Sequence, residues 1–181
     1  MSNKTITDIE GVYANGSHCG IKADKKDLAF IYVPDATASA GVFTKNKCAA
    51  PSVSLTKSHL AKSTLKAVII SSGNANAYTG EQGHQDTEKM IAITASKLGV
   101  LPTEVGVAST GVIGVPLPME KLEAGITQLL ENPKAQKGHD AAEAILTVDL
   151  VTKEVFKEAE NNGETLQVAG ISKGSGMIAP N

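Results

Sequence analysis

The chain has 181 residues and a net charge of -2, and its 41% hydrophobic and 20% charged residues are typical of a globular protein with a sizeable core. All 17 basic residues are lysines, and the aromatic residues are limited to three Tyr and three Phe, so the guanidinium forks and stacking surfaces that bind nucleic acids are lacking. No apolar run approaches the ~20 residues of a membrane span, and residues 1–10 lack a secretory pattern, so we expect a cytoplasmic protein with no nucleic-acid or membrane partner.

The first half of the chain alternates apolar segments with turn-forming residues. Asp27–Val33 is predicted to be a strand, and Gly41–Thr44 a second short one. Pro51–Lys62 has a weak helical pattern and precedes a buried strand at Lys66–Ser71. The Gly- and Asn-rich segment Ser72–Gly83 predicts an irregular loop, because these residues favour left-handed and side-chain-bonded turns.

The segment that follows this loop predicts a helix, a strand and a second helix. Asp86 suits the N-cap of a helix that ends before Gly99. Glu104–Ser109 predicts a strand that leads into a glycine-punctuated corner at Thr110–Gly114. Pro118–Glu131 places its leucines and isoleucine on one helical face.

The last part of the chain predicts one more helix and more extended structure. We expect a helix at His139–Leu146, an extended segment at Thr147–Phe156 and a final strand at Thr165–Ser172. No internal repeat or low-complexity linker interrupts the chain. We therefore predict one α/β unit that spans residues 1–181.

Several residue types that often carry chemistry do not form a site by sequence alone. The four histidines lack the i, i+4 spacing of a helical metal site. Adjacent side chains of an extended chain point to opposite sides, which disfavours a catalytic pair of His18 and Cys19. The glycines that follow Lys173 do not have the order of a phosphate-binding loop.

Two segments remain candidates for function. Thr110 and Gly111 combine a hydroxyl with a glycine N–H directly after a strand, a pair that can be aimed at a developing oxyanion, although these residues alone favour a simple turn at the strand's end. The segment Ser172–Asn181 ends on apolar residues, whereas a natural C-terminus is usually polar and frayed. We expect that the chain was cut from a longer precursor.

The sequence resembles the α chain of the ornithine acetyltransferase family, the bifunctional glutamate N-acetyltransferases of cyclic arginine biosynthesis. The resemblance spans essentially the whole chain, and its landmarks are GVYANGSHCGIK at Gly11–Lys22, SGNANAYTG at Ser72–Gly80, ASTGVIGVPLP at Ala108–Pro118 and SKGSGMIAPN at Ser172–Asn181. In that family the last landmark continues into Met-Ala-Thr, and the precursor cuts itself before the Thr.

The resemblance implies an α/β fold of layered sheets and helices, of the N-terminal-nucleophile-like type, and a partner. The β chain would begin with the nucleophilic Thr, whose free α-amine can act as its base. Two α and two β chains would form an α2β2 heterotetramer. The reaction would be a ping-pong transfer of the acetyl group from N-acetylornithine to glutamate. It needs no metal or organic cofactor, and some family members also accept acetyl-CoA as a substrate.

The resemblance also assigns residues. It places Thr110 and Gly111 in the oxyanion hole and matches Thr147 and Lys173 to the family's substrate-contacting Thr and Lys. Lys173 would supply the cation that an amino-acid carboxylate needs in a chain without arginine. The family's usual run of two Thr followed by Asp-Thr is altered here by Val148 and Leu150.

Two other functions remain open at this point. A related N-terminal-nucleophile aminopeptidase or amidohydrolase would use water in place of glutamate as the acceptor. A non-catalytic binding module would use the Gly- and Asn-rich segments only as turns. The sequence that follows Asn181 would separate these alternatives most directly.

Overall fold

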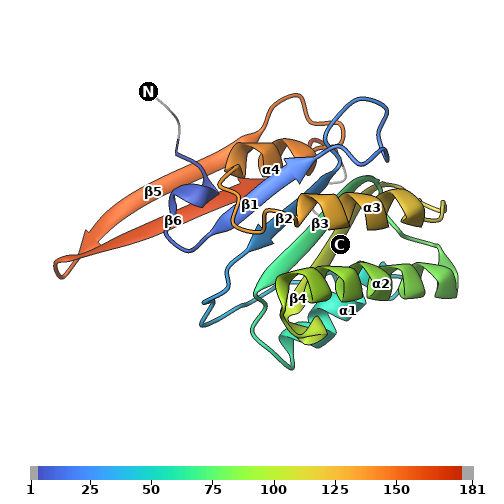
Figure 1. Ribbon diagram of the computed structural model, residues 1–181, viewed down its shortest axis with the longest axis horizontal. Helices are drawn as coiled ribbons and strands as arrows, with labels where there is room; N and C mark the ends of the chain where they lie inside the picture. Colours follow the sequence, from blue (N-terminus) through green and yellow to red (C-terminus); the bar gives the residue numbers. More distant parts are fainter. Residues whose placement is uncertain (1–3, 177–181) are drawn as a thin grey trace.

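The computed structural model describes residues 4–176 (Figure 1). The apolar end of the last landmark, residues 177–181, lies outside the described residues. The elements in chain order are η1 (Ile6–Asp8), β1 (Tyr13–Ser17), β2 (Leu28–Tyr32), α1 (Pro51–Leu60), β3 (Ala67–Asn74), α2 (Gly80–Leu98), η2 (Pro102–Glu104), β4 (Val105–Val112), α3 (Met119–Leu129), α4 (Gly138–Ala144), β5 (Lys153–Asn161) and β6 (Glu164–Ser172). The predicted α/β fold is confirmed. Within residues 4–176, no helix has the length and apolar character that a membrane crossing requires.

The main sheet has four strands in the order β1-β2-β3-β4. β1, β2 and β3 are antiparallel neighbours, whereas β3 and β4 are parallel. Ile69 of β3 pairs with Phe30 on one side and with Val107 on the other, which fixes the register of the three strands. The parallel pair needs a crossover, and α2 and η2 provide it. β4 is therefore an edge strand of this sheet.

Helices cover both faces of the sheet because its strands alternate apolar residues between them. Leu28 and Phe30 of β2 are fully buried in a cluster with Ile69, on the face covered by α1, α2 and α3. Ala29 points to the opposite face, where it packs with Ala144 of α4. The small alanines allow α4 to lie close to β1 and β2 (Figure 1).

The predicted helices are present, but α2 begins earlier than expected. Its C-terminus is the predicted one, because Gly99 adopts the left-handed conformation with φ 66°. Its N-cap is Thr79, so the prediction of Asp86 as N-cap is wrong. Asp86 lies within the helix and is buried, and its Oδ1 accepts a hydrogen bond of 2.8 Å from Gln82 Nε2.

The predicted strands need three corrections. Gly41–Thr44 forms no strand, because it has no partner strand in the described part of the chain. The extended segment predicted at Thr147–Phe156 becomes a strand only from Lys153. Strand β1 was not predicted: Asn15 and Gly16 lower the strand propensity, but Gly16 lets the backbone of Asp140 approach so closely that a Cβ would lie 2.0 Å from its carbonyl oxygen.

The segment predicted as an irregular loop, Ser72–Gly83, is more ordered than expected. β3 continues to Asn74, and α2 begins at Gly80. Between them Asn76 is fully buried at a left-handed φ of 48°. Its Nδ2 donates to Gly83 O and Thr87 Oγ1 at 2.8 Å, and its Oδ1 accepts from Thr79 Oγ1 at 2.7 Å. The asparagine thus joins the end of β3 to the first turns of α2.

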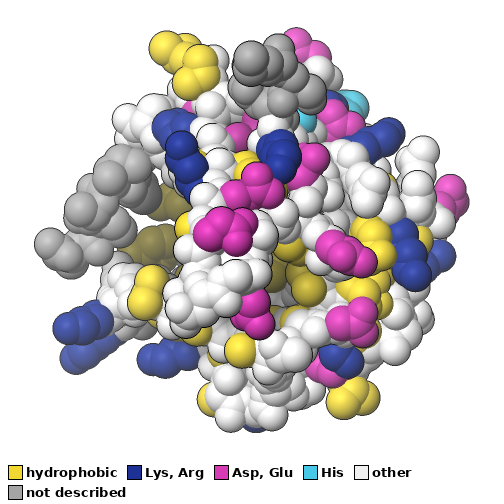
Figure 2. Space-filling model, turned by 90° about the vertical axis from the view of Figure 1, so that its left-hand side faces the viewer, with side chains coloured by type: hydrophobic (Ala, Val, Ile, Leu, Met, Phe, Trp, Pro, Cys, Tyr) yellow, Lys and Arg dark blue, Asp and Glu magenta, His cyan; other side chains and the backbone are white. Residues whose placement is uncertain are grey.

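Strands β5 and β6 form a separate two-stranded hairpin. Its tip is the pair Asn162 and Gly163, both with positive φ, as in the tight turns that suit twisted hairpins. The hairpin contacts η1 and α4 near its base. That residues 1–181 form a single unit stays a prediction. Seen from the end toward which the tip points, acidic and apolar side chains are intermingled on the surface (Figure 2).

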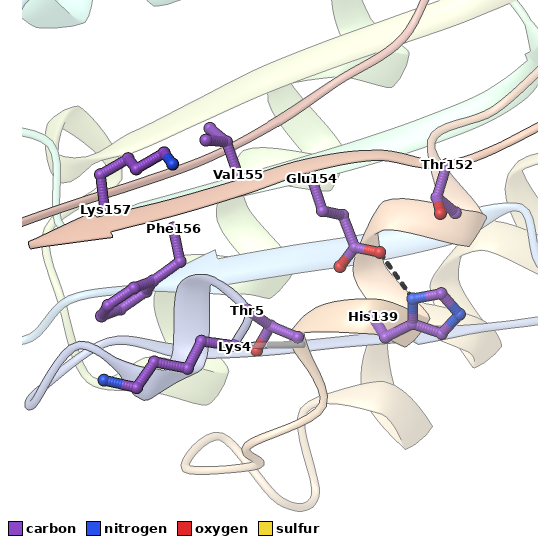
Figure 3. Close-up of a pocket in the computed structure, with 8 residues that line it drawn as sticks. All are labelled: Lys4, Thr5, His139, Thr152, Glu154, Val155, Phe156 and Lys157. Atoms are coloured by element: carbon purple, nitrogen blue, oxygen red, sulfur yellow. Dashed lines mark hydrogen bonds and ion pairs between the residues drawn. The ribbon is translucent and has the colours of Figure 1, made fainter. Parts of the chain in front are cut away.

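The two faces of the hairpin have different surroundings. Phe156 and Glu154 point from β5 toward η1 and α4, whereas Val155 and Lys157 point the other way (Figure 3). On the inner face, Ala169 and Ile171 pack against the core cluster under α4. On the outer face the apolar side chains are half exposed or more: Val155 49%, Leu166 50% and Val168 66%. The outer face is therefore an unpartnered apolar surface among the described residues.

Candidate active site

The predicted oxyanion residues lie at the end of the parallel strand pair. Thr110 pairs with Ser72 and Gly111 pairs with Gly73, so the predicted corner is still part of β4. A register shift follows between Gly73 and Asn74, and the chain turns only at Gly114. Because β4 is an edge strand, backbone N–H groups on its outer side can face a bound molecule.

Gly111 is required by the close approach of the two strands. Its φ is +136°, and a Cβ at this position would lie 2.3 Å from the carbonyl carbon of Gly73 and 2.7 Å from the nitrogen of Asn74. These atoms belong to backbone that is held in a sheet, so they cannot move aside without parting β3 from β4. Steric constraints alone therefore require a glycine at position 111, whether or not its N–H takes part in catalysis.

Lys173 and Thr110 are in direct contact although 63 residues separate them in the chain. The Lys173 ammonium donates a hydrogen bond of 2.8 Å to Thr110 Oγ1. An ammonium group only donates, so Thr110 Oγ1 is the acceptor in this bond, and the hydroxyl proton of Thr110 remains free for another partner. The structure thus brings Lys173 to the predicted pair Thr110 and Gly111, and the Thr110 hydroxyl remains a hydrogen-bond donor for a bound molecule.

Thr110 and Lys173 border a hollow of about 270 Å³. Apolar side chains from three elements form its wall: Ile70 of β3, Ile145 after α4 and Ile171 of β6. One polar rim beside an apolar wall is typical of sites for small molecules. The apolar wall was not predicted from the sequence, because its three isoleucines come from segments that only the fold places side by side.

Thr147 lies in the loop that follows α4, and no hydrogen bond joins it to Thr110 or Lys173 in the described structure. Its backbone N–H donates instead to Asp149 Oδ2 at 3.3 Å. The side chain of Asp149 is fully buried, and its Oδ1 also accepts 2.6 Å hydrogen bonds from Gly174 N and Lys153 Nζ. These bonds, that of Lys153 first, hold the pKa of Asp149 far below its usual range.

Asp149 was not predicted as a site residue. No local pattern indicated it, because an Asp side chain in a turn normally accepts from the N–H two residues further on, whereas Asp149 accepts from Thr147, two residues back. Its bond to Gly174, 25 residues further on, has no signal in a single sequence.

Cys19 is not an activated nucleophile. Burial of the thiol and its proximity to the Asp27 carboxylate raise the pKa of Cys19 to about 12. Asp27 is fully buried and accepts hydrogen bonds from the backbone N–H groups of Cys19, Gly20 and Lys22 at 2.6, 3.1 and 2.9 Å. A thiol of such high pKa stays protonated at neutral pH, which is the protonation state of an unactivated cysteine.

A larger hollow, about 820 Å³, lies between the inner face of β5 and the residues around η1 and α4 (Figure 3). His139 Nδ1 and Glu154 Oε2 form a 2.6 Å contact at one end of it, and Lys4 lies at the other. None of the four predicted site residues lines this hollow. Size alone therefore does not identify the site, and the smaller hollow beside Thr110 has the better-suited chemistry.

Comparison with known proteins finds similar sequences along the whole chain. The family model described as the ArgJ family matches residues 13–181. The arginine biosynthesis bifunctional protein ArgJ of Bacillus cereus is 43% identical over 182 aligned residues, which cover 100% of this chain and 45% of that protein. The protein of the same name from Shouchella clausii is 44% identical over 98% of this chain and 43% of its own length. The chain thus spans less than half the length of these curated relatives.

Solved structures agree with the sequence comparison. The crystal structure of the arginine biosynthesis bifunctional protein ArgJ from Bacillus halodurans superposes with a TM-score of 0.93 at 40% identity, over 100% of this chain and 95% of that one. The ornithine acetyltransferase of Mycobacterium tuberculosis, solved in complex with ornithine, superposes with a TM-score of 0.92 at 37% identity, over 100% and 97% of the two chains.

Proposed function

Because this chain belongs to the ArgJ family, we propose that it forms the α part of an acetyltransferase of arginine biosynthesis, which moves the acetyl group of N-acetylornithine to glutamate. The observation that carries the proposal is the contact between Lys173 and Thr110 beside an apolar hollow. The solved relative whose name states this activity, and which was crystallised with ornithine, supports the choice of substrate.

The proposed enzyme needs a second chain. The nucleophilic Thr and its α-amine would be supplied by a β chain, released by cleavage of a common precursor after the segment that contains Lys173. The lengths of the relatives support this: the curated proteins are more than twice as long as this chain, whereas the two solved chains match it over nearly their full length.

Two surfaces of the α chain suit such a partner. The outer face of the hairpin carries Val155, Leu166 and Val168, which are half exposed or more. The outer edge of β4 has no partner strand within residues 4–176. Apolar patches and free strand edges on one molecule favour coverage by another chain. We propose an α2β2 assembly in the cytoplasm.

The residues of this chain would act on the oxyanion of the acyl-transfer step. The β-chain Thr hydroxyl attacks the acetyl carbonyl carbon and gives its proton to the free α-amine. The carbonyl oxygen gains the negative charge, which Gly111 N–H and the free hydroxyl proton of Thr110 stabilise. The C–N bond then breaks, the ornithine nitrogen takes the proton, and an acetyl-enzyme remains. The amine of glutamate reverses these steps and leaves as N-acetylglutamate.

Lys173 would have two tasks in this scheme. Its ammonium has three protons, of which one is used for Thr110 Oγ1. Because Thr110 Oγ1 accepts this bond, the hydroxyl proton of Thr110 points away from Lys173 and can be donated to the substrate. A second ammonium proton can bind a substrate carboxylate, as the family resemblance implies. The chemistry uses no metal or organic cofactor, and acetyl-CoA would enter only as an alternative acetyl donor.

The test is a transfer assay with the full-length protein. The mature protein is incubated with N-acetylornithine, with and without glutamate, and the products are separated by mass spectrometry. N-acetylglutamate formed in proportion to released ornithine supports the proposal. Free acetate formed at the same rate without glutamate would identify a hydrolase instead. A protein that binds these molecules without turnover would be a binding module, and the proposal would fall.

A further inference from the structure

Asp149 connects the two segments that hold the predicted substrate-binding residues. Its fully buried carboxylate accepts from Thr147 N on one side and from Gly174 N on the other. Gly174 directly follows Lys173, and its φ of +135° is a conformation that other residues rarely adopt. A single side chain thereby ties the loop after α4 to the segment after β6.

The tie extends to the oxyanion residue. Gly174 N donates a 2.6 Å hydrogen bond to Asp149 Oδ1, and the ammonium of the neighbouring Lys173 donates a 2.8 Å hydrogen bond to Thr110 Oγ1. Lys173 directly precedes Gly174, so the carboxylate that anchors the Gly174 peptide also anchors the backbone from which the Lys173 side chain extends to Thr110. The position of the Lys173 ammonium therefore depends on the carboxylate of Asp149.

We infer that Asp149 is a positioning residue for the acyl transfer: its buried carboxylate sets Lys173 against Thr110 and fixes the backbone of Thr147 without touching the substrate. This role rests on the proposed function, because it concerns the same site. The atom type matters, since the three groups around the carboxylate are all donors, two N–H groups and the Lys153 ammonium. An amide in its place would turn its own NH2 donor toward at least one of them.

A purely structural role is the alternative. Lys153 begins β5, and its ion pair with Asp149 could serve only to stabilise the base of the hairpin. The two roles are separable because Lys153 and Gly174 contact the same carboxylate from different elements. Lys153→Met removes the ion pair and leaves the backbone N–H groups of Thr147 and Gly174 in place. It serves as the matched control for Asp149→Asn.

The experiment compares the two variants in the full-length, matured protein. Maturation is confirmed by mass, thermal unfolding is recorded, and kcat and KM are measured for N-acetylornithine and glutamate. We expect Asp149→Asn to lower kcat about 100-fold, as displacements of ~1 Å at catalytic groups do, and to raise KM as well, because Lys173 would also bind a substrate carboxylate. Lys153→Met should stay within about 2-fold of the wild type in both constants, because the N–H groups of Thr147 and Gly174 still hold the carboxylate.

Each outcome decides the matter. Equal losses in the two variants, in proportion to a lower Tm, would overturn the positioning role in favour of a structural one. Wild-type kinetics in Asp149→Asn would overturn it as well. If Asp149→Asn does not mature, Asp149→Glu keeps the charge and lengthens the side chain by one methylene. A matured Asp149→Glu with reduced kcat supports the role, whereas wild-type kinetics or failure to mature overturns it. Absence of acetyl transfer by the wild type would refute the proposed function itself.

Discussion

The two sheets of this chain are built from strands of similar length but are stabilised differently. β3 has 8 residues and β6 has 9, yet Ile69 of β3 is fully buried, whereas Val168 of β6 is 66% exposed. The four-stranded sheet is covered on both faces by helices of the same chain. The hairpin is covered on one face only, and a two-stranded hairpin is marginally stable by itself.

The proposed site lies where these two regions meet. Thr110 lies near the end of β4 in the main sheet, whereas Lys173 directly follows β6 of the hairpin. The contact between them therefore depends on how the hairpin packs against the sheet. One half of the proposed site therefore comes from the core of this chain, and the other half comes from a hairpin whose outer face would be covered by the proposed β chain.

The largest difference between the two regions should appear when glycines are replaced. Gly111→Ala places a Cβ 2.3 Å from the Gly73 backbone, so we expect turnover to fall about 1000-fold, equivalent to ~4 kcal/mol of barrier. Gly163→Ala at the hairpin tip meets no atom within 4 Å and should cost only the left-handed strain of ~1 kcal/mol, without loss of turnover. Steady-state kinetics of both variants checks this. Normal turnover in Gly111→Ala would contradict the assigned geometry.

Side-chain truncation should separate the regions next. Phe30 is fully buried in the main sheet, and Phe30→Ala should lower the free energy of unfolding by about 3–4 kcal/mol. Leu166 is 50% exposed on the hairpin, and Leu166→Ala should cost the chain less than about 1 kcal/mol. Urea titrations of residues 1–181 measure both values. Equal losses would mean that the hairpin contributes to the core as much as the sheet does.

The pH dependence of stability should follow the same division. Burial alone would raise the pKa of Asp27, but the N–H groups of Cys19 and Lys22 outweigh it and hold the pKa below its ordinary value. A depressed pKa contributes stability that is present above the unfolded-state pKa of about 4 and is lost as the pH falls through the folded-state pKa. Asp27→Asn should therefore flatten the fall in unfolding free energy below pH 5.

Glu158 of the hairpin is the matched control for Asp27. Its hydrogen bond from Gln167 and its ion pair with Lys4 also lower its pKa. Its side chain is 42% exposed, however, so solvent screens these interactions. Glu158→Gln should leave the stability of the chain unchanged at every pH. A slope as flat as that of Asp27→Asn would show that the hairpin and the sheet unfold as one unit.

The sequence predicted elements whose determinants are local. Helix α2 ends directly before Gly99, as predicted. The ends of β2 and β6 lie within one residue of the predicted bounds. β1 was not predicted because Asn15 and Gly16 lower its local strand propensity, whereas its pairing with β2 is a tertiary feature. β3 continued into a segment rich in Gly and Asn because β4 pairs with it there.

The candidate site shows the same limit. The resemblance to a known family indicated Thr110 and Lys173 separately, whereas their direct contact joins residues 63 positions apart. Asp149 was missed because its partner Gly174 lies 25 positions away. The hollow could not be predicted either, because its isoleucine wall is assembled from β3, β6 and the end of α4. Residue types are visible in one sequence, but their convergence is a property of the fold.

The smallest effect on the chain itself should come from the outer face of the hairpin. Val168→Thr keeps the side chain's shape and replaces a methyl group with a hydroxyl, at a residue that is 66% exposed. We expect the unfolding free energy of residues 1–181 to change by less than about 0.5 kcal/mol. In the two-chain protein the added hydroxyl would be buried under the β chain, at a cost of about 1–3 kcal/mol if it finds no partner there.

The informative quantity for Val168 is thus the difference between the two samples. Amide hydrogen exchange along β6 should be fast in residues 1–181 and slow in the two-chain protein, and Val168→Thr should accelerate it only in the latter. Val42→Thr makes the same replacement at a fully exposed valine outside the hairpin and should change neither sample. Equal exchange along β6 in both wild-type samples would show that the outer face stays uncovered. The stability of the hairpin would then come from its inner face alone, through Ala169 and Ile171.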